Sequence, residues 1–306
     1  MTTIARWIGG IMIILSLSTY TQLDDIYGED ELEEQADEII SGIAEKKAKT
    51  YEETAPSESR LSFYLNPWVG NLSATTFRGD APALAGTKFS IDEVGIDRTR
   101  FWPWFGATLK ITKLDMLGID VWGTSGGGNK VLSKNIDFDG FTFAAGDPVT
   151  SDIFIGHISV YYERSLVMPD EAPERFYLSW VLGASVLAWS LKLHDTNPQK
   201  NFAGQEKIWM LLPRSGLKAE KRFKIGSFPV AFRMGGFLEW IPKISKFRGH
   251  NFDIYLEVKI YLARALYLGG GYRYLTTSMS NEERTFDTDT ASFTVHGPYI
   301  TLGVDF

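Results

Sequence analysis

From Leu61 to the end of the chain, apolar and polar side chains alternate with a period of two. The segment FDIYLEVKIYL, residues 252–262, is the most regular example. Its apolar positions are Phe252, Ile254, Leu256, Val258, Ile260 and Leu262, and between them lie Asp253, Tyr255, Glu257, Lys259 and Tyr261. Successive side chains of a β-strand point to opposite faces. The pattern therefore predicts strands with one apolar face and one polar face.

This alternation predicts ten strands. They are expected near residues 61–72, 101–113, 115–124, 151–164, 175–192, 206–219, 225–240, 252–262, 265–277 and 292–306. Eight or twelve strands stay open, because Pro213 interrupts the 206–219 segment and a proline removes a ladder donor. Several segments reach the roughly 9–11 residues that a tilted strand needs to cross a bilayer.

The predicted fold class is all-β, a closed antiparallel transmembrane β-barrel. Strands that cross lipid must close into a barrel, because every backbone polar group there needs a partner. Long polar connections are expected on one side, at 74–99, 125–150, 193–205, 241–251 and 278–291, and shorter turns on the other. The run GGGNK at 126–130 is interpreted as a loop tip. An interfacial aromatic girdle is expected from Trp68, Trp102, Trp104, Trp240, Tyr272 and Tyr274.

The start of the chain predicts export. Arg6 precedes an apolar run from Trp7 to about Leu17, which is too short to span a bilayer and suits a signal peptide with cleavage after Ser18. The expected organisation is a signal peptide at 1–18, an acidic and partly helical periplasmic leader at 19–60, and a barrel at 61–306. The role of the leader stays open between a solvated tether and a segment that plugs the barrel or contacts a partner.

Charge and composition narrow the function classes. The formal net charge is −7 over 306 residues, and 13 acidic against 3 basic residues lie within 22–58. The body from residue 59 onward therefore sums to +2, without a dense basic patch, so nucleic acid is not an expected partner. The chain has no cysteine, which excludes disulfides, thiolate metal sites and a cysteine nucleophile.

Motifs for catalysis or metal binding are not evident. None of the four histidines lies in an HExxH or similar spacing, and we expect no metal, no cofactor and no catalytic residue. The best hydrolase candidate is Ser292 with His296, on one face of the last strand. At about 3.3 Å per residue they lie roughly 13 Å apart, whereas a nucleophile and its base need about 2.6–3.2 Å.

Charged residues on the polar face form the candidate site. They are Lys110, Asp120, Arg233, Glu239, Asp253, Glu257, Lys259 and Arg273. A three-residue turn at 263–265 would set Tyr255 opposite Arg273, with Asp253 and Glu257 on its diagonals. Lys110 is expected diagonal to Asp120 across the turn near residue 114. These charges predict either a self-paired polar filling of a narrow lumen or a charged constriction in a pore.

The last residues, YITLGVDF, resemble the terminal strand of Gram-negative outer-membrane barrels, through Ile300, Leu302, Val304 and Phe306. The segments GTKFSIDEVGID, NIDFDGFTFAAGDPVTSD and HISVYYERS, within residues 86–192, resemble uncharacterised outer-membrane proteins of the small OmpA-like or OmpW-like class. The resemblance implies a bacterial outer-membrane location, with outer-membrane lipid, lipopolysaccharide, the barrel assembly machinery and periplasmic chaperones as partners. It implies no activity and no site residues.

Three functions stay open. The first is a structural or surface-binding barrel that is not an enzyme and whose ligand is unknown. The second is a porin-like narrow channel for small solutes. The third is an outer-membrane lipid hydrolase or deacylase.

Overall fold

The computed structural model describes residues 60–79, 86–166, 176–197, 200, 202–226, 228–244, 247–263, 265–284 and 287–306. All of these residues lie in one compact unit, 51–306. The predicted signal peptide (1–18) and nearly all of the predicted leader (19–60) lie outside the described residues. No helix within the described ranges is long and apolar enough to cross a membrane.

The described chain is almost entirely β-structure. Its elements are β1 (Leu61–Gly79), β2 (Phe89–Ser90), the 3-10 helix η1 (Ile91–Val94), β3 (Thr99–Lys110), β4 (Asp115–Val131), β5 (Ile136–Phe138), β6 (Phe141–Phe143), β7 (Pro148–Ser165), β8 (Phe176–Asp195), β9 (Ala203–Ile225), β10 (Phe228–Ile244), β11 (Phe247–Tyr261), β12 (Leu266–Arg284) and β13 (Asp287–Asp305).

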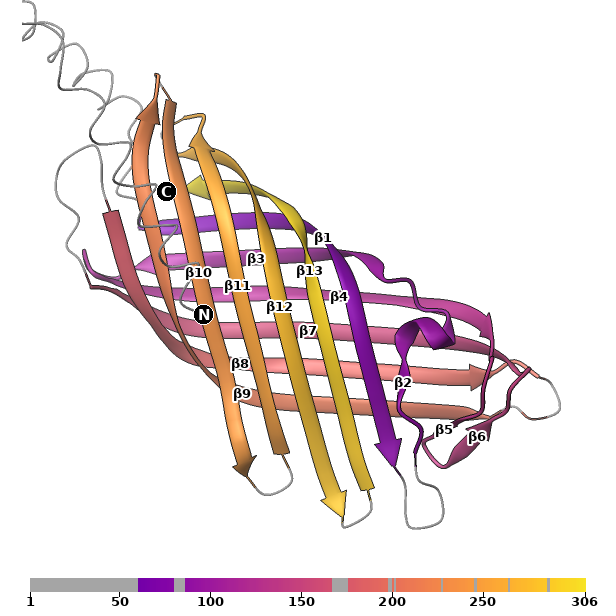
Figure 1. The fold of residues 1–306 in the computed structure, drawn as a ribbon. Coiled ribbons are helices and arrows are strands. Elements are labelled where there is room, and N and C mark those ends of the chain that lie inside the picture. Colours follow the sequence, from indigo (N-terminus) through magenta and orange to yellow (C-terminus); the bar gives the residue numbers. More distant parts are fainter. Residues whose placement is uncertain are drawn as a thin grey trace, which may run out of the picture. The chain divides into compact units, whose positions relative to one another are not determined.

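Ten long antiparallel strands form a closed barrel, which confirms the predicted fold class (Figure 1). The strand order is β1, β3, β4, β7, β8, β9, β10, β11, β12, β13, and β13 pairs with β1 to close the ring. Pro213 lies inside β9, one residue beyond the ladder with β10, which begins at Arg214. The backbone N–H that proline lacks is therefore absent at a position that has no partner residue on β10.

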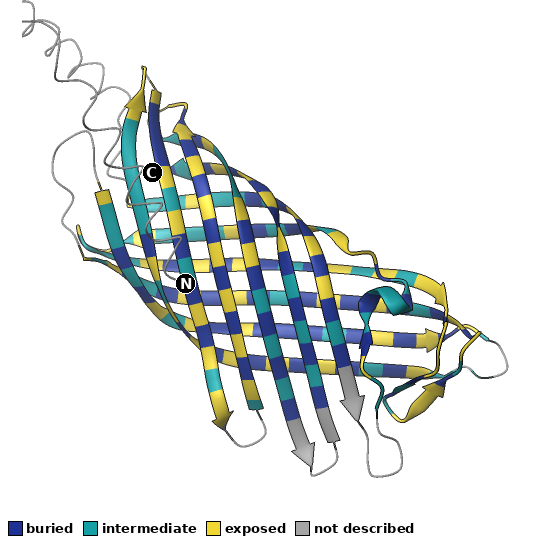
Figure 2. Cartoon of the chain, viewed as in Figure 1, coloured by how far each residue is buried: buried dark blue, intermediate teal, exposed yellow. Residues whose placement is uncertain are grey.

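An apolar band surrounds the barrel at the end that holds Phe306 and the turn at 111–114, here called the near end. Exposed and buried residues alternate along each strand there (Figure 2). The band is illustrated by one outward apolar side chain from each long strand, each between 42% and 55% exposed: Phe63, Phe105, Ile119, Ile158, Leu182, Leu217, Met234, Leu256, Leu268 and Leu302. An outward band of this kind is typical of transmembrane barrels.

The strands run further from this band than the alternation predicted, which corrects several expected loops. β4 continues to Val131, so 125–131 is strand and GGGNK is not a loop tip. β10 and β11 leave only residues 245–246 between them, and β12 and β13 leave only 285–286. β9 has 23 residues, far more than the roughly 9–11 that cross a bilayer. The opposite end, here called the far end, therefore stands clear of the band.

Beyond the band the barrel separates into two facing groups of strands. The β3–β4 ladder covers only Trp104–Lys110 against Met116–Trp122, and the β9–β10 ladder covers only 214–225. Figure 1 shows β4, β7, β8 and β9 running in a different direction from β10–β13 and β1. The inner faces of the groups pack on each other, as in the stacked rings of Trp189 and Phe293, 5.8 Å apart. The far half therefore resembles a β-sandwich more than an open tube.

Short elements cover the far end. The segment with β2 and η1 and the β5–β6 hairpin contribute Phe89, Ile91, Phe138 and Phe143 to the same apolar cluster as the strands. Backbone and side-chain bonds hold them in place, including Ser151 Oγ donating to the Val94 carbonyl at 2.8 Å. These elements extend the core at the far end.

Candidate functional site

The charged candidates meet inside the near half of the barrel, the region that the band surrounds. Tyr255 lies opposite Arg273, as predicted from the turn. The Arg273 guanidinium donates to both Asp253 oxygens at 2.9 and 2.7 Å and lies 4.1 Å from the Trp104 ring. Both charged side chains are 2–3% exposed. A buried charge requires such a partner, because its desolvation is otherwise uncompensated.

Glu257 belongs to a second group of charges rather than to Arg273. Its carboxylate lies 3.9 Å from Arg233 and 3.8 Å from Lys259, and it accepts a hydrogen bond from Thr301. Glu257, which was predicted on the other diagonal of Arg273, therefore interacts with Arg233, Lys259 and Thr301 instead.

Glu239 and Asp120 meet at Arg214, a residue that the sequence analysis did not single out. Arg214 lies 3.2 Å from Glu239 and 3.7 Å from Asp120. Glu239 also lies 3.1 Å from His157 Nε2 and accepts from Asn251 at 3.0 Å. Arg214 and Lys218 lie at even-numbered positions of β9 that point inward, and this spacing could have identified both residues from the sequence. Lys218 donates to Glu163 at 2.6 Å.

Lys110 does not lie diagonal to Asp120, so that prediction is wrong. The turn closes tightly, with the N–H groups of Ile111 and Thr112 bonded to the Asp115 carbonyl. Lys110 therefore pairs with Met116, and Asp120 pairs with Gly106. Four residues of strand, roughly 13 Å, separate the two side chains along the wall, and Lys110 is half-buried beside the near-end opening.

Tyrosine rings fill much of the remaining space in the near half. Five of them lie over the glycine directly opposite on a neighbouring strand: Tyr64 over Gly106, Tyr161 over Gly118, Tyr255 over Gly235, Tyr267 over Gly303 and Tyr299 over Gly271. A Cβ atom on Gly118 would lie 2.2 Å from the Tyr161 ring. Only glycine leaves room for these flat rings, which pack the lumen as solid core.

Apolar side chains fill most of the far half of the lumen, and among them the buried Thr76 donates to Glu206. None of the following inward residues is more than 2% exposed: Leu72, Ile155, Leu187, Trp189, Leu191, Ile208, Met210, Leu275, Met279, Phe293 and Val295. Trp68, Trp102 and Trp104 also face inward, at 6% exposure or less, so their place in the expected girdle is wrong. Trp240, Tyr272 and Tyr274 do face outward. A water-filled channel would leave its lining residues accessible, and these residues are not.

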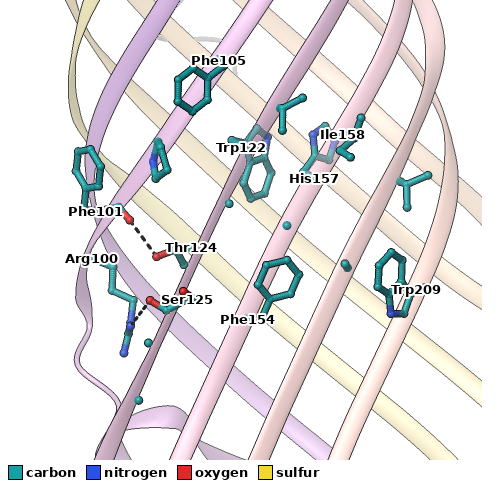
Figure 3. A pocket seen from close by; sticks show the side chains of 18 of the residues that line it. Arg100, Phe101, Phe105, Trp122, Thr124, Ser125, Phe154, His157, Ile158 and Trp209 are labelled. Atoms are coloured by element: carbon teal, nitrogen blue, oxygen red, sulfur yellow. Dashed lines mark hydrogen bonds between the residues drawn. The ribbon is translucent and has the colours of Figure 1, made fainter.

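A groove in the wall has a volume of about 820 Å³ (Figure 3). It lies where the β3–β4 ladder ends, and we call it the wall groove. Its apolar lining comes from outward side chains: Phe101, Phe105, Val121, Phe154, Ile158 and Trp209. Two inward residues, Trp122 and His157, line it as well. The wall groove therefore connects the outer surface to the lumen side chains.

The sequence analysis missed this groove. Its cause is Pro103, which has no N–H for the β4 ladder, together with the glycine-rich run GTSGGG at 123–128. Side chains satisfy part of the separated backbone: Thr124 Oγ1 donates to the Phe101 carbonyl at 2.9 Å, and Arg100 donates to the Ser125 carbonyl at 3.3 Å. The glycines were available as a signal but were assigned to a loop.

The Ser292–His296 pair shows separate hydrogen bonds. Ser292 Oγ donates to Ser278 Oγ at 3.1 Å, and His296 Nδ1 lies 2.8 Å from the Tyr272 hydroxyl. Across the residues that the structure describes, no group of three or more His, Asp or Glu side chains is arranged to hold a metal ion.

Comparisons with known proteins assign no family. No family model matches the chain, and no curated protein matches it. It is similar to the outer membrane protease OmpT from Escherichia coli (12% identity, covering 83% of this chain and 98% of that one, TM-score 0.46). It is also similar to the P. putida toluene transporter TodX (9%, 82% and 91%, 0.29) and the monoaromatic hydrocarbon channel CymD (8%, 82% and 89%, 0.33). At these values the likeness transfers no activity, and the OmpA-like or OmpW-like class stays a prediction.

Proposed function

We propose that this chain is a bacterial outer-membrane β-barrel that acts by binding at its surface and does not conduct solutes through its lumen. One observation carries the proposal. The far half of the lumen is packed with apolar side chains that are at most 2% exposed, from Leu72 on β1 to Phe293 on β13. Ions and small polar solutes have no hydrated path through such a core, because removing their hydration shell is costly.

The location rests on the outside of the barrel. The near half has a continuous apolar band, while the far half has buried apolar residues inside and polar residues outside, such as Lys192 and Lys207. The near end then faces the periplasm and the capped far end faces outward, because bacterial barrels have their longer connections outside. Ile300, Leu302 and Phe306 face outward on the closing strand β13. They are available to an assembly machinery that reads the terminal strand, as the resemblance implies.

Planar bilayers test the closed lumen. The refolded full chain is expected to give no conductance steps, with heat-modifiable migration and protease resistance in the same vesicles proving insertion. A porin of known conductance serves as the positive control. Stable steps from the inserted protein would contradict the proposal and favour the channel.

The lipid hydrolase or deacylase remains the enzymatic alternative. His157 paired with Glu239 beside the wall groove favours it, because a carboxylate commonly orients a histidine base. Mass spectrometry of lipid A from cells with and without the protein tests this alternative. An unchanged acylation pattern would dismiss it.

A further inference from the structure

The wall groove has two walls of different character. Apolar residues of the lipid-facing surface line the part of the groove nearest the near end, and three neighbouring strands place a row of small residues across its floor. That row consists of Gly123, Gly156 and Ala188, which lie in register on β4, β7 and β8, and it ends at Trp209 on β9. With side chains this small, the outer surface is hollowed between Phe101, Phe154 and Trp209 (Figure 3). The volume is within the range of small-molecule sites, about 300–1,000 Å³.

Two buried polar atoms at this groove lack partners. Trp122 and His157 are each 2% exposed and line the groove, and their rings stack with centroids 4.8 Å apart. Among the described residues, neither Trp122 Nε1 nor His157 Nδ1 has a hydrogen-bond partner, although His157 Nε2 is bonded to Glu239. Buried polar groups in folded proteins are normally paired. A polar group that enters from the groove pairs with these atoms only after one of the rings turns, because neither atom is accessible in this structure.

Cationic side chains stand at the far end of the groove. A second hollow of about 570 Å³ shares Ser125, Phe154 and Trp209 with the first. Its lining adds the exposed Lys192 and Lys207 together with one acid, Asp152. Arg100 and Asp97 line the first hollow. The lining residues of the two hollows thus carry three cations against two acids.

The order of these features along the strands matches an amphiphile. Val121 and Ile158 mark a fully apolar row, Trp122 and His157 follow one residue further from the near end, and Ser125 marks a row that holds both Lys207 and the apolar Phe154. Three residues, about 10 Å of strand, separate Trp122 from Ser125. A membrane lipid presents acyl chains, then ester or amide groups, then a phosphate, over a similar distance and in the same order.

We propose that the wall groove binds a phosphate-bearing acylated lipid of the surrounding outer leaflet. One acyl chain occupies the apolar hollow, a carbonyl or hydroxyl near the headgroup bonds to Trp122 or His157, and the phosphate faces Lys192 and Lys207. The ligand comes from the membrane because the hollow opens on the lipid-facing side of the wall. This inference rests on the proposed surface-binding function and names its site and ligand class.

A filled groove provides the main test. The variant Ala188→Phe places a ring in the row of small residues, whereas Ala184→Phe places the same ring on the same face of β8, four residues nearer the band and outside the lining. The full chain is inserted in phosphatidylethanolamine nanodiscs, and retained lipid A is measured by native mass spectrometry. We expect Ala188→Phe to weaken lipid A binding at least tenfold and Ala184→Phe to change it less than twofold. Equal binding by both variants and the parent would overturn the proposal.

Headgroup and polar contacts are tested separately. The double variant Lys192→Gln/Lys207→Gln is expected to weaken binding of diphosphorylated lipid A at least fivefold and to leave its dephosphorylated form unchanged, with Lys88→Gln as the control away from the groove. Trp122→Phe retains an aromatic ring but removes Nε1 together with part of the indole, and it is expected to weaken both forms two- to fivefold. Equal losses for both lipid forms in the lysine variant would refute the phosphate contact. The Ala188→Phe and lysine variants lie outside the packed lumen, so conductance of the parent protein would sink the proposed function without affecting their result.

Discussion

Arg273→Met tests whether the charges inside the near half are held as pairs. The substitution leaves the Asp253 carboxyl 2% exposed, with neither of its two bonds to the guanidinium. Removing one partner of a buried pair costs about 3–5 kcal/mol. Since the guanidinium also lies 4.1 Å from the Trp104 ring, we expect the upper part of that range. With a urea slope of about 3 kcal/mol per molar, the unfolding midpoint should fall by roughly 1–2 M.

The assay is reversible urea unfolding in lipid vesicles, followed by tryptophan fluorescence and heat-modifiable migration. Arg164→Met is the matched control, because Arg164 is half-exposed and its nearest Asp115 oxygen is 3.6 Å away; its unfolding midpoint should hardly move. The double variant Arg273→Met/Asp253→Asn should recover part of the loss, since no charge is then left without a partner. A loss below about 1 kcal/mol in the single variant, or a double variant that costs the sum of both singles, would refute the reasoning.

Three further changes probe other parts of the molecule. Leu187→Ala, in the far-half core, should cost about 2–5 kcal/mol in the same urea assay, because it leaves a cavity. Gly118→Ala should cost about 1–3 kcal/mol through overpacking, because the new methyl group meets the Tyr161 ring. The Lys200 ammonium, 2.7 Å away, holds the pKa of Asp147 below its ordinary value, so that stabilisation is present above about pH 4 and lost as pH falls through the lowered pKa. Lys200→Gln should raise that pKa in a carboxyl NMR titration.

Matched variants keep these outcomes interpretable. Leu182→Ala removes the same side chain from the lipid-facing side of β8, where it is 48% exposed, and should cost less than the core variant. Gly236→Ala adds a methyl group where no heavy atom lies within 4 Å, and it should be tolerated. If either control loses as much stability as its partner, the packing explanation fails.

Alternation alone was enough to predict the barrel and one ion pair. The segment 252–262 fixes which residues share a face, and a short turn fixes its register against the next strand, so Arg273 could be placed beside Asp253. The prediction for Lys110 also depended on a turn, and it was wrong because the turn before Asp115 closes more tightly than predicted. Register predictions from sequence depend on the turn, and one residue of error moves every pair.

The packed interior of the far half could not be predicted from the alternation, because a period of two does not reveal whether a face contacts lipid, water or another layer of strands. On β8 the apolar positions are even-numbered up to Val186 and odd-numbered from Leu187 to Leu193. The first set faces lipid and the second faces the core. The switch was visible in the sequence, but only a second packed layer explains it. Arg214 was missed because Pro213 lowered the weight given to the whole segment, and the wall groove because its glycines were assigned to a loop.

The exchange of apolar faces along single strands gives the protein a depth marker. If a strand slid by one residue, charged side chains would enter hydrocarbon in the near half while leucines of the far half turned toward water. A strand with this exchange, such as β8, therefore opposes slippage at two heights at once, and the point of exchange fixes how deep the barrel sits. An ordinary barrel has only its apolar outer band to fix its depth in the membrane, whereas here the outer band and the apolar core of the far half fix it together.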